Sequence, residues 1–354
     1  MSLKPYKKSW QKMWERITLT NDTKCFAIVS LLQGITLIIL QLRMFLRNTS
    51  LSDQMDSYIE QNGTLATSCE MGFAENRLTL MFAESFCFIF FQIFQFYFCL
   101  HAIIHQNMFQ IFVILGLDIA SSLYGIVQQS EIEIELDIIS NDCPGIYKFS
   151  PNYELYEYPN IIASSVFALV NLIFTVRLFL LFERKMYKKS NIELNNPALY
   201  RRVLIFVMML KLDAFLVVIN VSLTLAVIPF LGQQSMMFII AYVIHASILL
   251  LSFLALILAY NSLIRQWKIG LYIFLAYWVL FTADFTFLIK DGISAASSGW
   301  YFWVSTIIVT LIAALVTFYY TCVLVANFGY DLKQIIDNKR SNEEISIISE
   351  AVSK

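Results

Sequence analysis

Six ionisable side chains lie inside long apolar stretches of the sequence. They are Glu84, Asp118, Lys211, Asp213, His245 and Asp284. A charge in hydrocarbon is costly, so such groups usually face the interior of a helix bundle. They can carry a proton or a cation along a transport path, or they can pair with one another and fix helix packing. We favour packing, because the sequence shows neither the broken helices nor the repeat halves typical of transporters.

The helical rise of about 1.5 Å per residue places these groups at two levels in the membrane. Asp118, Lys211 and Asp213 lie roughly 12–15 Å from the predicted cytosolic ends of their helices. An ion pair between Asp118 and Lys211 is therefore feasible. Glu84, His245 and Asp284 lie nearer the opposite side, roughly 9–14 Å from it, and would form a proton relay in a transporter.

An intramembrane zinc hydrolase is the enzyme class that the histidines could suggest. His101 and His105 are spaced like two ligands on one helix face, but His245 lies roughly 15 Å or more from them by helix rise. Zinc–nitrogen bonds are about 2.0–2.1 Å long, so one zinc ion cannot use all three. Other catalytic motifs, such as a P-loop or a Gly-x-Ser-x-Gly turn, are absent. We expect no catalytic residue, no metal ion and no cofactor.

The composition identifies the class of protein that holds these residues. Of 354 residues, 58% are hydrophobic and only 14% are charged, whereas soluble domains have about 25% charged residues. The net charge of −1 gives no reason to expect a nucleic-acid partner. The expected partner is the lipid bilayer, and protein partners stay unknown.

Eight stretches reach the roughly 20 apolar residues that a membrane-spanning helix needs. They are 25–46, 78–101, 108–128, 160–182, 203–228, 236–260, 270–289 and 300–326. The predicted fold is therefore an all-α, polytopic bundle of eight transmembrane helices. The least secure span is 270–289, because it contains Asp284 and ends next to Lys290. Without it the chain would have seven spans, as in a heptahelical receptor.

The distribution of Lys and Arg predicts the orientation, because basic residues collect in cytosolic loops. They are frequent in the segment 1–24, in the loops 183–202 and 261–269, and in the segment 327–354. The loops on the other side carry only Arg47, Arg77, Lys148 and Lys290. Both termini are therefore predicted to be cytosolic, which requires an even number of spans. The segment 1–24 would be a basic tail with an amphipathic helix, and 327–354 a polar tail.

Two longer loops, 47–77 and 129–159, are predicted on the luminal side. Asn48 and Asn62 begin glycosylation sequons, and Asn62 is the better acceptor because Asn48 follows the first span too closely. Cys69 and Cys143 lie one in each loop, where an oxidising lumen would allow a disulfide between them. In the second loop, acidic and apolar residues alternate from 131 to 138, which predicts a short amphipathic strand.

Several segments together resemble an uncharacterised fungal family of multi-pass membrane proteins of the Golgi apparatus. These segments are Trp14-Glu15-Arg16-Ile17-Thr18, His105-Gln106-Asn107, Leu199-Tyr200-Arg201-Arg202, Leu210-Lys211-Leu212-Asp213 and Asn327-Phe328-Gly329. The helix that follows His105-Gln106-Asn107 and ends with Tyr124 and Gln128 is also part of the resemblance. The resemblance implies a Golgi membrane location and implies no reaction.

The sequence therefore predicts a non-enzymatic integral membrane protein of the secretory pathway with a structural, sorting or cargo-interacting role. A proton- or cation-linked transporter that uses the intramembrane acids is the alternative. A heptahelical receptor-like protein is a further alternative that depends on the loss of one span.

Overall fold

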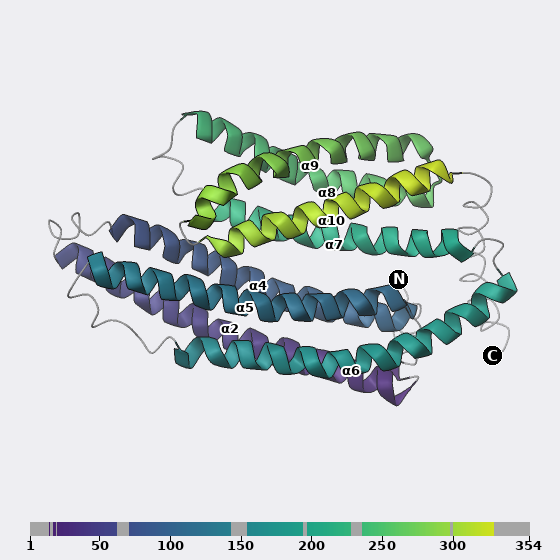
Figure 1. Ribbon diagram of the computed structural model, residues 1–354, viewed down its shortest axis with the longest axis horizontal. Coiled ribbons are helices and arrows are strands. Elements are labelled where there is room, and N and C mark those ends of the chain that lie inside the picture. The colour runs from purple at the N-terminus through teal and green to yellow at the C-terminus, as the bar shows by residue number, and fades with distance from the viewer. Residues whose placement is uncertain are drawn as a thin grey trace, which may run out of the picture. The chain divides into compact units, whose positions relative to one another are not determined.

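The computed structural model describes residues 14, 17, 18, 20–61, 71–142, 154–193, 197–227, 236–297 and 300–328. Its helices are α2 (Asn21–Gln61), α4 (Met71–His105), α5 (Met108–Asp142), α6 (Glu154–Glu193), α7 (Pro197–Val227), α8 (Met236–Ile264), α9 (Lys268–Ser297) and α10 (Tyr301–Ala326), as Figure 1 shows. Each of these eight helices contains a segment long and apolar enough to cross a membrane. The prediction of an all-α, eight-span membrane protein is confirmed, and the uncertain span 270–289 is the middle of α9. Eight spans, rather than seven, weigh against the receptor-like alternative.

The helices run further than the predicted spans, so most of the two predicted luminal loops is helical. In the first loop, α2 continues to Gln61 and α4 begins at Met71. In the second, α5 continues to Asp142 and α6 begins at Glu154. The short strand predicted at 131–138 is therefore wrong. Extending an existing helix avoids the costly step of nucleation, and Glu favours helix, so the alternating segment simply prolongs α5.

The chain divides into two compact units. Unit 1 comprises the residues up to Glu183 together with 222–239 and 291–305. Unit 2 comprises 184–221, 240–290 and the residues from Thr306 onward. In unit 1, α2 packs on α4 and α4 packs on α5, while hydrogen bonds connect α6 with α2 and α5. In unit 2, such bonds connect α8 with α9, α9 with α10, and α10 with α7.

The core of unit 1 is unusually polar for a membrane protein. Its buried positions recur every three or four residues along each helix, which is the spacing of a helix face that packs in a bundle. On α5, for example, the buried residues include Ile111, Ile114, Asp118, Ser121 and Gln128. Buried polar residues of the other helices include Gln33, Gln41, Glu84, Gln92, Gln95, Asn160, Ser164 and Asn171. The apolar surface faces outward, as expected for contact with lipid.

The core of unit 2 is dominated by aromatic side chains. On α9, Phe274, Trp278, Phe281 and Phe285 form a continuous column with ring centroids 4.7–4.8 Å apart. The indole nitrogen of Trp278 donates a hydrogen bond to the carbonyl of Ala314 on α10, at 2.9 Å. Such a column fills space with large rings and satisfies the single polar atom of Trp278, as buried tryptophan requires.

The same tight turn joins two helices in each unit. Gln106 between α4 and α5 has φ of 51°, and Gln266 between α8 and α9 has φ of 56°. In each turn the glutamine nitrogen bonds to a carbonyl three residues earlier, and the next nitrogen bonds to one five residues earlier. This pattern is the Schellman helix terminus, in which a left-handed residue satisfies the last free carbonyls.

The two units also share the pattern of buried positions that follows this turn. Ile111, Ile114, Asp118 and Ser121 after the first turn correspond in spacing to Leu271, Phe274, Trp278 and Phe281 after the second, and all eight are buried. The first and last helices are also joined by a polar contact in each unit. Asn171 bonds to Gln33 in unit 1, and Thr317 bonds to Asp213 in unit 2. The similarity lies in burial and turn geometry rather than in residue identity, and the expectation that the chain lacks repeat halves stays a prediction.

The predicted terminal segments are mostly outside the described residues. Trp14 is 66% exposed, and the amide and hydroxyl of Thr18 both bond to its carbonyl at 2.9 Å. These contacts form one helical turn within the amphipathic helix that the sequence predicts. The rest of that helix, and all of the polar tail beyond Phe328, lie outside the described part of the chain.

Candidate functional site

All six intramembrane ionisable residues lie within membrane-spanning helices, but they belong to different units. Glu84 and Asp118 are in unit 1, on α4 and α5. The other four are in unit 2: Lys211, Asp213, His245 and Asp284. Glu84, Asp118 and Asp213 are almost fully buried, with 1%, 0% and 3% of their surface exposed.

Asp118 is the meeting point of all four helices of unit 1. Its Oδ1 accepts hydrogen bonds from the side-chain amides of Gln33 on α2, at 2.6 Å, and of Gln95 on α4. Its Oδ2 accepts one from Asn171 on α6, at 2.9 Å. The Asn171 nitrogen also donates to Gln33 Oε1 at 2.7 Å, so the amides bond to one another as well. We call these four residues the Asp118 cluster.

Chain position explains why these four side chains meet. Gln33, Gln95, Asp118 and Asn171 lie at similar distances from the predicted cytosolic ends of their spans, at Asn21, His105, Met108 and Arg184. At about 1.5 Å per residue, all four are roughly 15–20 Å deep, near the middle of a bilayer about 30 Å thick. Antiparallel helices with polar residues at equal depth bring those residues to one level. The donors face both carboxylate oxygens, as suits an ionised carboxylate, which only accepts hydrogen bonds.

From Asp118 toward the predicted luminal side, the core of unit 1 continues as a series of polar contacts. Gln92 donates to Ser121 at 3.4 Å, and Gln41 donates to Gln128 at 3.3 Å. Beyond them, Glu131 Oε1 accepts a bond from the backbone nitrogen of Phe302, at 2.7 Å, near the start of α10. There the carboxylate satisfies a free amide of a helix N-terminus, which attracts negative charge.

The predicted luminal end of this polar core holds a buried ion pair. Arg47 Nη1 lies 2.8 Å from Glu157 Oε1, with 6% and 1% of the two side chains exposed. The remaining guanidinium nitrogens of Arg47 donate to Asn48 Oδ1 at 2.7 and 3.0 Å. The sequence places Arg47 and Glu157 in loops, because neither lies in a strongly apolar stretch, and the structure corrects this by placing both in helices.

From Asp118 toward the predicted cytosolic side, the core of unit 1 contains a group of apolar side chains. These residues are almost fully buried: Phe26, Phe98, Ile103, Ile111, Ile114, Leu178 and Phe182. Polar side chains are buried on this side as well, among them Ser30, Gln110 and Thr175. Polar and apolar groups therefore lie on both sides of Asp118.

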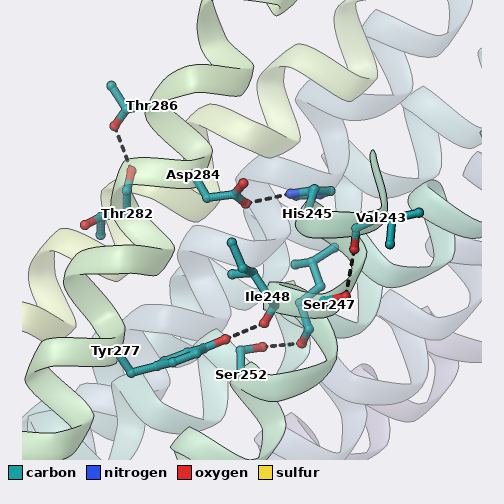
Figure 2. Close-up of polar contacts among 10 residues, drawn as sticks. Val243, His245, Ser247, Ile248, Ser252, Tyr277, Thr282, Asp284 and Thr286 are labelled. Carbon is teal, nitrogen blue, oxygen red and sulfur yellow. Dashed lines mark hydrogen bonds and ion pairs between the residues drawn. The ribbon is translucent and has the colours of Figure 1, made fainter. Parts of the chain in front are cut away.

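In unit 2 the structure brings His245 and Asp284 together (Figure 2). His245 Nδ1 on α8 lies 2.6 Å from Asp284 Oδ2 on α9, with 12% and 14% of the side chains exposed. The edge of the His245 ring packs against Phe285, with centroids 5.6 Å apart. One helical turn deeper, the Tyr277 hydroxyl donates to the carbonyl of Ile248 and joins the same two helices. Two of the three predicted relay residues thus form a pair, whereas Glu84 lies in unit 1 and its part in a relay stays a prediction.

The remaining acid of unit 2 is held by a hydroxyl. Asp213 accepts a hydrogen bond from Thr317 on α10, and two turns further along α7, Asn220 donates to Thr310 at 2.9 Å. Lys211 is half-buried on α7. Because Lys211 and Asp118 belong to different units, their ion pair stays a prediction.

The three histidines are also divided between the two units. The rings of His101 and His105 lie against each other, with centroids 4.2 Å apart, and His101 Nδ1 lies 2.9 Å from Gln110 Oε1. His245 is in unit 2 beside Asp284. Within the part of the chain that the structure describes, no group of three or more His, Cys, Asp or Glu residues could hold a metal ion.

The luminal modifications predicted from the sequence have different outcomes. Asn48 is inside α2 and only 2% exposed, and its Nδ2 atom is buried within the described structure. A glycan would be attached to that nitrogen, which the folded chain shields, and glycosylation of Asn48 stays a prediction. Asn62, Cys69 and Cys143 lie outside the described residues.

Sequence reasoning found Asp118 but missed the three amides that hold it. A search for ionisable groups passes over Gln33, Gln95 and Asn171, because they carry no charge. Their signal is positional: glutamine and asparagine recur on helix faces that are otherwise apolar. The comparisons give no further guide to this site, since no protein-family model, curated protein or solved structure matches the chain.

Proposed function

We propose that the chain is a non-enzymatic membrane protein of the Golgi with a structural, sorting or cargo-interacting role. The supporting observation is that buried polar side chains of unit 1 bond to one another across all four helices, as in the Asp118 cluster. Interhelical hydrogen bonds of this kind fix the packing of helices in a membrane. A helix bundle fixed in this way suits a protein that presents a constant surface to other membrane proteins or cargo.

The Golgi location rests on sequence features rather than on geometry. They are the resemblance to the fungal Golgi family and the predicted luminal position of Asn62, Cys69 and Cys143. An oxidising lumen with glycosylation is a property of the secretory pathway.

The test compares the protein content of Golgi vesicles from fungal cells with and without this chain. We expect the tagged chain to fractionate with Golgi membranes, and its loss to change the amounts of a defined set of secretory proteins there. Arg47→Met should disrupt unit 1 and change the protein content in the same way as loss of the chain. The double variant Arg47→Met with Glu157→Leu should restore the normal protein content. A chain found outside the Golgi, or an unchanged protein content, would contradict the proposal.

A proton- or cation-linked transporter is the second candidate, because two observations favour it. The core of unit 1 holds the buried carboxyl group of Asp118 among polar side chains, and the two units share one turn and one spacing of buried positions. Matched halves and intramembrane acids are both common in transporters. Purified protein in liposomes should then move protons or Na⁺ down an imposed gradient, and Asp118→Asn should abolish the flux. Liposomes no more permeable than empty ones would exclude this role.

A further inference from the structure

The carboxyl group of Asp118 lies in the middle of the membrane with no positive side chain beside it in unit 1. Its described partners there are the three neutral amides of Gln33, Gln95 and Asn171, and no Lys, Arg or His of that unit forms an ion pair with it among the described residues. The titratable side chain near it is the thiol of Cys99 on α4. An ionised carboxylate in such a place is costly unless a positive charge accompanies it.

Three buried oxygen atoms that lack a hydrogen-bond donor belong to the residues that contact this carboxyl group or lie one helical turn from them. Among the described residues, Gln95 Oε1, Asn171 Oδ1 and Thr175 Oγ1 are buried without a partner. Two of them belong to the amides that already contact Asp118, so a half-turn of either amide would bring its oxygen to the carboxyl group. Thr175 lies one helical turn from Asn171 on α6, on the same buried face. Carboxylate, amide and hydroxyl oxygens are the ligands of hard cations, and an amide oxygen also accepts a proton-bearing carboxyl group.

Unit 2 shows that this arrangement of helices does not require a polar residue at the position of Asp118. The residue at the same place after the matching turn is Trp278, which is fully buried in the aromatic column. It satisfies its one polar atom with the carbonyl of Ala314. A bundle with the same turn and the same buried positions therefore packs with an aromatic side chain there. Helix packing alone does not account for a carboxyl group at this point in unit 1.

Polar groups continue through the core of unit 1 on both sides of Asp118. Toward the predicted lumen, the contacts of Gln92 with Ser121 and of Gln41 with Gln128 offer hydrogen-bonding groups at successive levels. Toward the predicted cytosol, the hydroxyl oxygens of Ser30 and Thr175 are buried without a partner among the described residues. Polar groups lower the cost of placing a charge in the membrane, so the surroundings of Asp118 suit a bound cation.

We propose that the Asp118 cluster, with Thr175, binds one small monovalent cation, either H⁺ or Na⁺. One carboxylate balances one positive charge. The side-chain amides of Gln33, Gln95 and Asn171 suit both cations, because an amide can turn. Its oxygen can face Na⁺ or a protonated carboxyl group, and its nitrogen can donate to an ionised carboxylate. The site goes beyond the proposed structural role, and it would supply the binding step of the transport alternative.

The test measures binding in the purified full-length protein, so it does not depend on transport. Thermal unfolding is followed in NaCl and in choline chloride at equal ionic strength, and infrared difference spectra between acid and alkaline pH report protonated carboxyl groups. Asp118→Asn removes the charge with little change of shape. Asp213→Asn is the matched control, because Asp213 is a buried acid of unit 2 that Thr317 already satisfies.

For a Na⁺ site we expect a saturable rise of Tm in NaCl that is lost in Asp118→Asn and kept in Asp213→Asn. For a proton site we expect no such rise, but a protonated carboxyl band that disappears at alkaline pH and is missing from Asp118→Asn. If Asp118→Asn fails to fold, Thr175→Val should still weaken a Na⁺ effect, and Asp118→Glu should shift the frequency of the carboxyl band of a proton site. If the protein shows neither a Na⁺-specific rise of Tm nor a titrating carboxyl band, the proposal is overturned. Binding without flux in liposomes would keep the site and exclude transport.

Discussion

Arg47 and Glu157 form a buried ion pair between the first and fourth helices of unit 1, with 2.8 Å between Nη1 and Oε1. Arg47→Met should leave the Glu157 carboxylate buried without its counter-charge, which typically costs about 3–5 kcal/mol. Adding Glu157→Leu should restore most of the stability, because exchanging a whole buried pair for apolar residues is often nearly neutral. Thermal unfolding in detergent measures both changes. Equal instability of the single and the double variant would show that the pair does not act as a unit.

His245 and Asp284 should be energetically coupled, because their side chains touch and are both largely buried. In a double-mutant cycle with His245→Leu and Asp284→Leu, we expect a coupling energy of about 0.5–3 kcal/mol in the free energy of unfolding. Thr286→Ala is the control, since the Thr286 hydroxyl bonds to the carbonyl of Thr282 in its own helix, at 2.7 Å. The effect of Thr286→Ala on the free energy of unfolding should add to that of His245→Leu. If Thr286 shows a coupling energy with His245 as large as that of Asp284, the specific pairing of His245 with Asp284 is contradicted.

Gly270 is required by the tight turn between α8 and α9. A Cβ atom at this position would lie 2.1 Å from Ser262 Oγ and 2.6 Å from a ring carbon of Trp267. Gly270→Ala should therefore destabilise the protein by about 1–3 kcal/mol, as overpacking usually does. At Gly34 a Cβ atom would meet nothing within 4 Å, so Gly34→Ala should be neutral or slightly stabilising. The unfolding temperatures of the two variants test this difference. An equal fall of Tm in both would contradict the steric explanation for Gly270.

Cys69 and Cys143 are predicted to form a disulfide that connects the first two luminal segments. If the chain is cut once between residues 70 and 142, the fragments should migrate together on a gel until a reductant is added. Cys69→Ser is the control, because it removes one partner and should release the fragments without reduction. Separate fragments from the wild-type chain under non-reducing conditions would exclude the bond.

Eight spans predict that both termini lie on the same side of the membrane. Tags placed at Met1 and Lys354 should both be removed by protease added to intact membrane vesicles that contain the chain, because the basic residues predict a cytosolic position for these ends. A luminal protein in the same vesicles checks that the membrane is closed. Protection of one tag alone would require an odd number of spans.

The eight spans could be predicted from the sequence because each apolar stretch is long enough to cross a membrane. The C-terminal ends of α2 and α5 could not be predicted, because charged residues such as Asp53 and Glu133 end the apolar pattern while the helix continues. The alternation around Glu131 has the period of a strand, yet the preceding helix extends through it at little cost.

The candidate site was predictable in part. Asp118 stands out because a carboxyl group in an apolar stretch is rare. The similar predicted depths of His245 and Asp284 correctly suggested that these two residues are neighbours. Gln33 and Asn171 could not be assigned to Asp118 from the sequence, because that requires knowing which helices are adjacent and how they are rotated. The similarity of the two units was hidden for a related reason. Asp118 and Trp278 occupy matching positions, but they share no chemistry.

The shared turn of Gln106 and Gln266 has a consequence for how the protein is made. If each turn is the middle of a four-helix module, then each module crosses the membrane an even number of times. Its own ends then emerge on one face, and the chain passes from one module to the next between Glu193 and Pro197. The translocation machinery could therefore insert the first module completely before the second leaves the ribosome. Each set of four helices could then enter the bilayer by itself, before contacts such as that of Glu131 with Phe302 connect the two sets.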